Sequence, residues 1–361
     1  MPEKVMVGMS GGVDSSVSAL LLQEAGYECL GVTLHLYDGE ETDAPEGRTC
    51  CSLSDAEDAR AAAYAMGMKH YVLNARDAFE EAVIRDFVCS YEAGDTPNPC
   101  IQCNRRLKFP HMYQKARELG CDYIATGHYA RVERREDGRW LLKKGLDLSK
   151  DQSYVLYGLS QEILAHTKFP LGALTKPQVR ELAGQRGLIN AQKRDSQDIC
   201  FVPDGDYESF IRRYTGKTYP PGDFVDESGK ILGQHRGMIG YTVGQRRGLG
   251  IAAAKPLYVL RKDTKSNRVI LADNAALFSR TLRATGLNLI DRERIDAPLR
   301  CEAKIRYSHG QAACVAEQTG QDELTVTFDE PQRAITPGQA VVLYDGDTVI
   351  GGGTIREAAG Q

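Results

Sequence analysis

The chain has 361 residues, of which 42% are hydrophobic and 26% charged, and its formal net charge is −4. This length suits two or three domains, and a balanced composition without low-complexity tracts excludes a disordered chain. No apolar run approaches the ~20 residues that span a bilayer, and the N-terminal "MPEKVMVGMSGG" is too poor in apolar residues for a signal peptide. We therefore expect a cytoplasmic protein with no membrane contact.

The first half of the chain predicts a doubly wound α/β domain on a parallel sheet. Apolar runs typical of strands occupy residues 4–9, 28–37, 69–75 and 122–130. Amphipathic helical patterns cover residues 13–25, 55–66, 78–92 and 108–119. A β-hairpin is expected over residues 131–145, because "EDG" separates a charged run from an apolar run.

The second half predicts β structure after one more helix. That helix covers residues 175–188, carries Pro177 in its first turn and leads through a connecting region to Cys200. From about Tyr219 the sequence is rich in Gly, Pro and β-forming residues. We expect three domains: the α/β domain with its connecting region (1–208), a basic, Gly-rich central domain (209–275) and a C-terminal β-barrel (276–361).

The turn "GMSGGVDSS", residues 8–16, leaves the first strand and enters the first helix. Such a turn points backbone N–H groups and the positive end of the helix dipole at one place, which predicts an anion site. It is not a Walker motif, because that motif requires a lysine near its end and this turn has Asp14 instead. A carboxylate is a better ligand for magnesium than for phosphate. The alternative is a tight turn with capping serines.

Residues 10–16, "SGGVDSS", lie between the first predicted strand and the first predicted helix, and they closely resemble the PP-loop of ATP pyrophosphatases. Those enzymes cleave ATP to AMP and pyrophosphate and thereby adenylate a substrate. The resemblance implies activation chemistry, in which a carbonyl oxygen becomes an AMP ester that a nucleophile can displace.

Two of the ten cysteines, Cys100 and Cys103, form a CxxC in the Pro-rich segment "TPNPCIQCN". No second CxxC follows, so a zinc ribbon would lack its other half, and a thioredoxin-like site would need the motif at a helix start directly after a strand. The cations Arg105, Arg106 and Lys108 favour a reactive thiolate. The alternative is a solvated basic loop.

Cys200, in "DSQDICF", is a second candidate for a reactive thiol. Two such cysteines in a PP-loop enzyme suggest sulfur transfer, in which one thiol accepts sulfane sulfur and the other resolves the product. Five others are expected to act as small buried hydrophobic residues: Cys29, Cys89, Cys121, Cys301 and Cys314. Cys50 and Cys51 receive no functional interpretation.

Seven separated motifs together resemble the tRNA-specific 2-thiouridylase family over nearly the whole length. They are "GMSGGVDSS", "TPNPCIQCN", "ATGHYAR", "KDQSYVLYGLSQ", "DSQDICF", "GQHRGMIGYTVGQRRGLG" and "KIRYSH". The resemblance implies a sulfurtransferase that replaces the C2 oxygen of the wobble uridine in tRNAs of the Lys, Glu and Gln types. It further implies ATP with Mg²⁺ and a persulfide sulfur donor protein that is fed by a cysteine desulfurase.

The resemblance also assigns residues. Cys200 would carry the persulfide and Cys103 would be the second catalytic cysteine. The implied ATP contacts are Gly8, Met9, Ser10, Gly11, Gly12, Val13, Asp14, Ser15, Leu34 and Gly127. The implied tRNA contacts are Asn98, Pro99 and Cys100 at the target base, with His128, Lys150, Asp151, Gln152, Arg306, Tyr307 and Gln339 elsewhere. His128 follows the strand at 122–127, and ligands of α/β proteins bind at such strand ends, although a structural histidine is the alternative.

Cys100 departs from part of the family, because some members carry aspartate at this position. The thiol is then a spectator, a substitute for a carboxylate acid/base group, or a third ligand. In the last case Cys100, Cys103 and Cys200 would hold a [4Fe–4S] cluster with one open iron, which is a rival mechanism for the same reaction.

Residues 212–255 contain eight Lys or Arg and three Asp or Glu, a net charge of +5 in a chain of net charge −4. A local basic surface fits phosphate contacts with tRNA, whereas the alternative is the solvated face of a small domain. An unpaired anticodon loop is a substrate whose uridine leaves its stack at low cost. Two rival functions remain: a PP-loop synthetase acting on a small metabolite, and a tRNA-binding module without activity.

Overall fold

The computed structural model describes residues 2–37, 53–191, 193 and 199–359. It contains two compact units. The first comprises Met1–Ile84, Pro99–Gly205 and Asp347–Val349, and the second comprises Arg85–Asn98, Asp206–Gly346 and Ile350–Gln361. Cys50, Cys51 and most of the "DSQDICF" motif lie outside the described residues.

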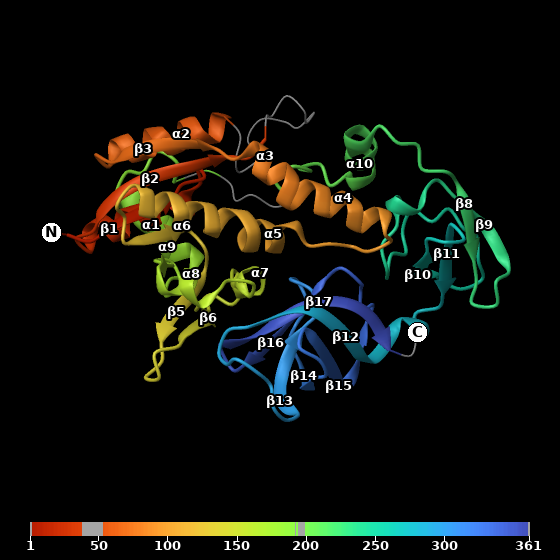
Figure 1. Cartoon of the computed structure of the whole chain (residues 1–361). Coiled ribbons are helices and arrows are strands. Elements are labelled where there is room, and N and C mark those ends of the chain that lie inside the picture. Colours follow the sequence, from red (N-terminus) through yellow and green to blue (C-terminus); the bar gives the residue numbers. More distant parts are fainter. Residues whose placement is uncertain (1, 38–52, 192, 194–198, 360–361) are drawn as a thin grey trace. The chain divides into compact units, whose positions relative to one another are not determined.

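The first unit is built on a five-stranded parallel sheet in the order β3-β2-β1-β4-β7 (Figure 1). Its strands are β1 (Lys4–Gly8), β2 (Glu28–His35), β3 (Lys69–Asn74), β4 (Tyr123–Thr126) and β7 (Thr167–Lys168). The predicted doubly wound α/β domain is confirmed. The chain moves outward from β1 in one direction to β2 and β3 and in the other to β4 and β7. Ligands of such sheets bind where the strand order reverses, here at the carboxyl end of β1.

The side chains of β1 point alternately to the two faces of this sheet, and helices cover both faces. Val5 and Val7 pack in one buried cluster with Ala19 of α1 (Val13–Glu24) and Ala59 of α2 (Leu53–Ala65). On the opposite face Gly8 lies so close to α6 (Phe109–Glu118) that a Cβ there would meet the sulfur of Met112 at 3.1 Å. Successive strand residues point to opposite faces, so one short apolar strand binds helices on both sides.

The remaining helices of the first unit are mostly short. They are α3 (Arg76–Phe79), η2 (Glu80–Ile84), α5 (Pro99–Gln102), η3 (Cys103–Lys108), α6 (Phe109–Glu118), α7 (Ser153–Leu156), α8 (Gln161–Ala165) and α9 (Lys176–Gln185). The expected single helix over 78–92 is interrupted by the π-helical η2. The helix expected from 108 begins at Pro99 instead, so the CxxC opens a helix and does not lie in a loop. Pro99 explains this start, because proline is well accommodated in a first helical turn.

The predicted hairpin over 131–145 is confirmed as β5 (Ala130–Arg134) and β6 (Trp140–Lys144). It extends from the first unit, where Lys143 pairs with Thr348 and the Arg131 guanidinium contacts the Asp347 carboxylate at 2.7 Å. No helix among the described residues has the length and apolar character that a membrane span requires.

The second unit begins with α4 (Arg85–Glu92) and α10 (Tyr207–Thr215), followed by a four-stranded sheet in the order β10-β11-β8-β9. Its elements are β8 (Gly222–Val225), β9 (Ile231–His235), η4 (Met238–Gly240), β10 (Tyr258–Asp263), β11 (Arg268–Ala272) and η5 (Ala275–Leu277). The helix α10 was not expected. Asp206 caps it by accepting from the Ser209 amide at 3.0 Å, and Gly216 ends it in the left-handed region.

The C-terminal strands of the second unit pair in the order β12-β15-β14-β13-β16-β17, and β12 pairs again with β17. The strands are β12 (Phe278–Leu289), β13 (Leu299–Lys304), β14 (Ala312–Gln318), β15 (Glu323–Arg333), β16 (Ala340–Asp345) and β17 (Thr348–Ala359). This closure confirms the predicted β-barrel. Its interior is a buried apolar cluster that includes Leu282, Val326 and Phe328.

Candidate functional site

The turn Gly8–Ser15, which we call the nucleotide turn, connects β1 to the N-terminus of α1, as the sequence predicts. Gly11 has φ +72°, and a Cβ there would lie 2.5 Å from the Asp55 carbonyl oxygen, so a side chain is excluded. The Ser15 hydroxyl donates to the Gly12 carbonyl at 3.0 Å and accepts from the Ser10 amide at 3.2 Å. The turn thus encloses the start of a twelve-residue helix, whose positive end favours an anion.

Gly127, which follows β4, lies against this turn. A Cβ at Gly127 would lie 2.8 Å from the Ser15 amide nitrogen, which only glycine permits. Two further predicted ATP contacts, Met9 and Leu34, are buried, and the Met9 amide donates to the Val32 carbonyl at 2.7 Å. The carboxyl ends of β1, β2 and β4 therefore bring the predicted ATP-binding residues together.

Asp14 makes two contacts that the sequence did not reveal. The Lys176 ammonium lies 2.8 Å from both oxygens of the Asp14 carboxylate, and the Tyr129 hydroxyl donates to one of them at 2.8 Å. Lys176 is the first residue of α9 and is only 7% exposed. The expected magnesium ligand is thus already neutralised by a lysine, which gives the turn the cation that a Walker motif carries in its own loop.

Asn190 holds the turn from outside. Its Nδ2 donates to the Gly11 carbonyl at 3.0 Å and lies 2.7 Å from the Ser16 hydroxyl, and the side chain is 6% exposed. Nearby, the Lys193 ammonium pairs with Asp55 at 2.8 Å. The chain that leads toward Cys200 is therefore fixed to the nucleotide turn. Neither Asn190 nor Lys176 carries a local sequence signal for this role.

The two cysteines of the CxxC differ in exposure. Cys100 lies on α5 and is exposed, whereas Cys103 opens the π-helical η3 and is 9% exposed. The next residue, Asn104, donates to the Val155 carbonyl at 3.1 Å and so ties η3 to α7. The two cysteines of the CxxC therefore differ in their exposure to solvent.

Cys200 is half-buried and is anchored at the carboxyl end of the sheet. The Tyr37 hydroxyl, two residues beyond β2, donates to the Cys200 carbonyl at 2.6 Å. The neighbouring Phe201 is 2% exposed and packs edge-on against Phe79 of α3, with ring centroids 5.6 Å apart. Since α3 and η2 also pack against η3, the segments of Cys103 and Cys200 share one support.

The remaining cysteines partly differ from expectation. Cys301 and Cys314 are buried, as predicted, but Cys29 and Cys121 are half-buried and Cys89 is exposed on α4. Burial raises the pKa of the Cys29 thiol to about 11, so that thiol stays protonated at neutral pH. None of these five belongs to the candidate site.

The predicted cluster ligands do not form a metal site in this arrangement. Over the described residues, which include Cys100, Cys103 and Cys200, no three His, Cys, Asp or Glu side chains are placed to hold a metal ion. The exposed Cys100 and the buried Cys103 face different environments. The residues present therefore do not fit a cluster, and we derive no step through one.

His128 follows β4 at the carboxyl edge of the sheet. Its Nδ1 lies 2.7 Å from the Thr126 hydroxyl, and its ring packs with Phe109 and Phe169 at centroid distances of 5.7 and 6.1 Å. Burial, with a smaller effect of the Lys108 ammonium, lowers the pKa of His128 well below its ordinary value. The imidazole is therefore neutral at pH 7.

Asp151 and Gln152 are engaged within the first unit. The Asp151 carboxylate accepts from the amides of Gly145 and Ser153, each at 3.1 Å, and from the Ser153 hydroxyl at 2.8 Å. The Gln152 side chain accepts from the Tyr129 amide at 3.0 Å. Lys150, beside them, is half-buried. These hydrogen bonds fix the loop that contains Asp151 and Gln152. The buried Asp151 carboxylate accepts most of them.

Four predicted tRNA contacts belong to the second unit. Arg306 donates to the carbonyls of Val243 and Ala334, each at 3.1 Å, and to the Thr336 hydroxyl, so it joins the central sheet to the barrel. Tyr307 is 43% exposed and lies under the Lys304 ammonium. Asn98 and Gln339 are half-buried. Tyr307 alone among the four presents a large exposed ring, which suits stacking on a base.

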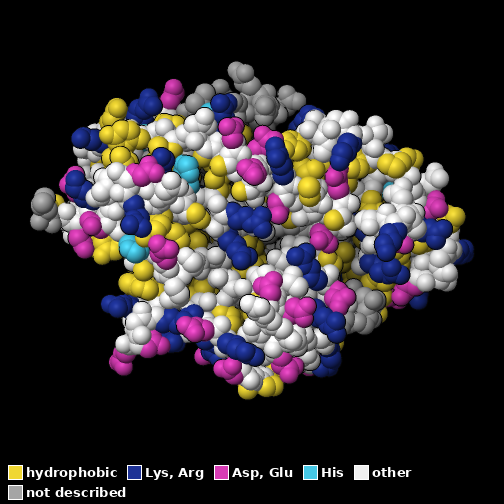
Figure 2. All heavy atoms as spheres, in the orientation of Figure 1, with side chains coloured by type: hydrophobic (Ala, Val, Ile, Leu, Met, Phe, Trp, Pro, Cys, Tyr) yellow, Lys and Arg dark blue, Asp and Glu magenta, His cyan; other side chains and the backbone are white. Residues whose placement is uncertain are grey.

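The basic stretch 212–255 is partly neutralised by acids outside it. The Arg212 guanidinium pairs with Glu208 and the Lys217 ammonium with Glu92, each at 2.7 Å. Six other cations of the stretch are exposed: Arg213, Lys230, Arg236, Arg246, Arg247 and Lys255. Figure 2 shows dark blue Lys and Arg side chains at its right side, where Figure 1 has the strands β8 to β11. The surface remains basic but is smaller than the count of residues suggests.

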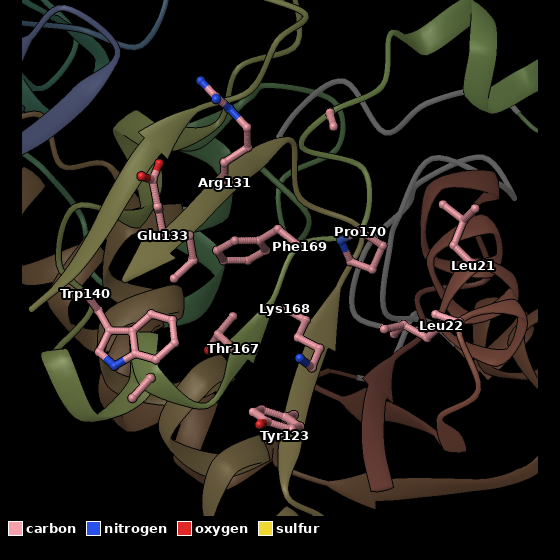
Figure 3. Close-up of a pocket in the computed structure, with 14 residues that line it drawn as sticks. Leu21, Leu22, Tyr123, Arg131, Glu133, Trp140, Thr167, Lys168, Phe169 and Pro170 are labelled. Atoms are coloured by element: carbon pink, nitrogen blue, oxygen red, sulfur yellow. The ribbon is translucent and has the colours of Figure 1, made fainter. Parts of the chain in front are cut away.

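A pocket of about 530 Å³ lies elsewhere in the first unit (Figure 3). Trp140 and Glu133 of the hairpin, Lys168 of β7 and Tyr123 of β4 line it. The Lys168 ammonium lies 3.8 Å from the centre of the Tyr123 ring. None of the predicted site residues lines this pocket, so it is separate from the candidate site.

The fold and the site define a class of protein: a parallel-sheet nucleotide-binding enzyme followed by two β domains. Three family models match in this order, namely the tRNA methyl transferase HUP domain over residues 3–204, the tRNA methyl transferase PRC-barrel domain over 208–273 and the aminomethyltransferase beta-barrel domain over 279–355. The PP-loop type of the first domain fits an ATP-utilising enzyme.

The chain belongs to the tRNA-specific 2-thiouridylase family. It is 49% identical over 359 residues to tRNA-specific 2-thiouridylase MnmA of Clostridioides difficile, covering 99% of each chain. It is also 52% identical to the proteins of that name from Acetivibrio thermocellus and Moorella thermoacetica, covering 98% of this chain and 99% of each relative. The family models carry a methyl-transfer name, whereas these full-length relatives are named for thiolation.

One solved structure that is similar to part of the chain is more remote than these relatives. The U34-tRNA thiolase NcsA from Methanococcus maripaludis with its [4Fe-4S] cluster is 18% identical, and the match covers 59% of this chain and 66% of that one with a TM-score of 0.35. A similarity at this level carries no argument about the chemistry of this chain.

Proposed function

We propose that this protein catalyses ATP-dependent 2-thiolation of the wobble uridine in tRNAs of the Lys, Glu and Gln types. One observation carries the proposal: the turn Gly8–Ser15 and the anchored Cys200 segment lie at the carboxyl ends of neighbouring strands of one sheet, and the Cys103 helix packs on the same α3–η2 support as Cys200. This arrangement supports a reaction in which adenylation and sulfur transfer both take place in the first unit.

Activation comes first in the proposed reaction. The C2 oxygen of uridine attacks the α-phosphorus of ATP, pyrophosphate leaves, and C2 then carries AMP as a leaving group. The amide groups at the start of α1 and the Lys176 ammonium stabilise negative charge on the departing pyrophosphate. Asp14, whose carboxylate oxygens contact Lys176 here, is the residue that would hold Mg²⁺ bound with ATP, and the ion would supply positive charge to the phosphates.

Sulfur transfer follows. A persulfide on Cys200 attacks C2 through its terminal sulfur and displaces AMP. The Cys103 thiolate then attacks the Sγ of Cys200, the sulfur–sulfur bond breaks, and a Cys103–Cys200 disulfide forms as 2-thiouridine leaves. An external dithiol reduces that disulfide. A sulfur donor protein fed by a cysteine desulfurase reloads Cys200.

Recognition of tRNA is assigned to both units. The anticodon loop supplies an unpaired uridine, and the exposed cations of the central region, residues 209–275, contact phosphates. Asn98, Pro99 and Cys100 line the space for the target base. His128 stays neutral at pH 7, so it acts there as a hydrogen-bonding group and not as a cation.

The test is a reconstituted reaction. The protein, ATP, Mg²⁺, a small-molecule persulfide and unmodified tRNA are incubated under anaerobic conditions, and 2-thiouridine is measured by mass spectrometry of nucleosides. We expect product with wild type and none with Cys200→Ser. Absence of product with wild type, or equal product with Cys200→Ser, would contradict the proposal.

Iron and sulfide analysis of the same anaerobic preparation addresses the alternative mechanism. Activity that requires iron, and that Cys100→Ser abolishes, would favour a cluster held by Cys100, Cys103 and Cys200. ATP–pyrophosphate exchange that a small metabolite stimulates and tRNA does not would favour a synthetase.

A further inference from the structure

The segment before the CxxC is held by a turn of the C-terminal barrel within the second unit. The Thr96 amide donates to the Pro337 carbonyl at 2.9 Å. The Gln339 side chain then donates through Nε2 to the Thr96 carbonyl at 2.8 Å and to the Pro97 carbonyl at 3.3 Å. Three hydrogen bonds thus join the turn Pro337–Gln339 to the two residues that precede Asn98.

Close packing at position 338 of this turn excludes every residue that has a side chain. Gly338 has φ +88°, and a Cβ there would lie 2.8 Å from the Thr96 nitrogen and 2.9 Å from the Asp95 Cβ. Backbone bonds fix the turn itself, because the Gly338 amide donates to Ile355 and the Ile355 amide donates to Gln339. The turn is therefore a rigid part of the barrel, and the segment is bound to it.

Two oppositely charged, half-buried side chains, Asp95 at the start of this segment and Lys262 of β10, interact with each other. Burial raises the pKa of Asp95, and burial lowers the pKa of Lys262 to about 8, while their opposite charges counter both shifts. The Lys262 ammonium also donates to the Tyr241 carbonyl at 3.0 Å. Within the second unit the barrel turn thus holds the segment 95–97, and Lys262 of the central sheet attracts its first residue, Asp95.

We infer that Gln339 is a positioning residue that fixes the carbonyls of Thr96 and Pro97, and through them the course of the chain into Asn98 and Pro99. A carboxamide has two donor hydrogens on nitrogen and one acceptor oxygen. Both hydrogens are directed to protein carbonyls, so Gln339 can meet RNA only through Oε1. The RNA partner of Gln339 is then a donor, a 2′-hydroxyl or a base amino group, and not a phosphate.

This inference rests on the proposed function, which places the target base beside Asn98 and Pro99. A bond between Oε1 and an RNA donor would strengthen the two donated bonds, because hydrogen bonds in a chain polarise one another. Docking of the anticodon loop on the barrel would then tighten the segment that leads to the base site.

The test compares four proteins without tRNA and with it. Gln339→Met removes donor and acceptor at nearly constant size, and Gln339→Glu keeps an acceptor but cannot donate. Gln332→Met is the matched control, because Gln332 is half-buried in the same barrel and donates only to the Glu330 carbonyl beside it. Cooperative unfolding of each variant confirms that it folds.

Hydrogen exchange in the absence of tRNA is the deciding measurement. We expect both Gln339 variants to exchange the amides of Asp95, Thr96 and Asn98 about tenfold faster than wild type and Gln332→Met, because local opening becomes easier. At saturating tRNA, we expect thiolation to slow about tenfold with a smaller change in tRNA KM.

A pure RNA contact gives the opposite pattern. Exchange would equal that of wild type in both Gln339 variants, and only the KM for tRNA would rise; that result would overturn the positioning role. The exchange measurement does not depend on catalysis. A failure of the proposed function would instead appear as absence of 2-thiouridine with wild type, whatever the exchange rates are.

Discussion

The nucleotide turn and the segment before Cys103 are held in different ways. The turn Gly8–Ser15 is braced by side chains of the same unit that lie far away in the sequence, namely Lys176 and Asn190. The segment 95–97 is held mainly through its own backbone, by the barrel turn Pro337–Gln339. Buried side-chain braces, one of them a charged lysine, suit a site with one fixed ligand, whereas a few hydrogen bonds to the backbone leave a segment adjustable to a large substrate.

The comparison predicts that damage to the two regions has separable effects. Loss of a brace at the nucleotide turn should impair the ATP step and leave tRNA affinity intact. Loss of contacts in the second unit should impair tRNA-dependent steps and leave ATP binding intact. Substitutions in each region, and of the thiols that both regions serve, test that separation.

The largest expected effect is that of the two thiols to which the proposed function assigns catalysis. Cys103→Ser and Cys200→Ser should each lower 2-thiouridine formation by a factor of about 10³ or more, since removal of a nucleophile costs that much in comparable enzymes. ATP binding should be unchanged. Cys89→Ser is the matched control, because Cys89 is an exposed cysteine outside the site. Equal activity of Cys200→Ser and Cys89→Ser would refute the assignment.

Lys176→Met should lower kcat/KM for ATP on the order of 10²-fold, which is the usual effect of losing one donor to developing charge. The Kd for tRNA should stay within about twofold, well below the ~1.4 kcal/mol of a tenfold change. Lys115→Met, which removes an exposed lysine paired with Glu118, is the control and should be neutral. Tighter tRNA binding with unchanged ATP kinetics would show that the brace is not specific to the nucleotide turn.

Arg246→Ala together with Arg247→Ala should weaken tRNA binding about tenfold at low salt. The slope of log K against log salt should fall by about 1 to 2, one for each lost phosphate contact. ATP binding should not change. The control replaces Arg283 and Arg294, which carry the same charge on exposed side chains of the barrel region. A salt slope equal to that of wild type would exclude phosphate contacts here.

The last prediction concerns the stability of the fold and not activity, through His70, which supports the nucleotide turn from β3. Its Nε2 lies 2.9 Å from the Thr33 hydroxyl, which donates to the Met9 carbonyl at 2.6 Å. Burial lowers the pKa of His70 to about 4 from an ordinary 6.5, with a smaller effect of Arg60. The unfolded chain therefore takes up a proton first as pH falls, and the stabilisation by neutral His70 is lost between about pH 6.5 and 4.

That loss amounts to about 3 kcal/mol, because each tenfold difference in proton affinity between the folded and unfolded chains is worth ~1.4 kcal/mol. Urea unfolding at several pH values measures it. The free-energy difference between wild type and His70→Gln should shrink as pH falls through this window. Parallel curves would mean that His70 is not held neutral by the fold.

Much of the architecture could be predicted from the sequence, because it is encoded locally. The alternation in β1, the turn "SGGVDSS" and the hairpin around "EDG" all act through neighbouring residues. The π-helical segments η2 and η3 could not be predicted, since their irregular bonds depend on packing. The helix α10 did have a signal, Asp206 three residues before Ser209 with Gly216 at its end.

The braces of the site are the part that sequence reasoning missed. Lys176 reaches Asp14 across 162 positions and Asn190 reaches Gly11 across 179, and no local pattern encodes such contacts. Gln339 was expected as a tRNA contact by resemblance. Only the structure reveals that its amide donates to the Thr96 and Pro97 carbonyls.

The most direct measurement of the central claim follows one sulfur atom. Cys200 is loaded with ³⁵S persulfide, excess donor is removed, and ATP and unmodified tRNA are added for a single turnover. The account predicts that the label moves from Cys200 to 2-thiouridine, with AMP formed in equal amount and a Cys103–Cys200 disulfide left on the protein. Label that stays on the protein while unlabelled 2-thiouridine forms would contradict it.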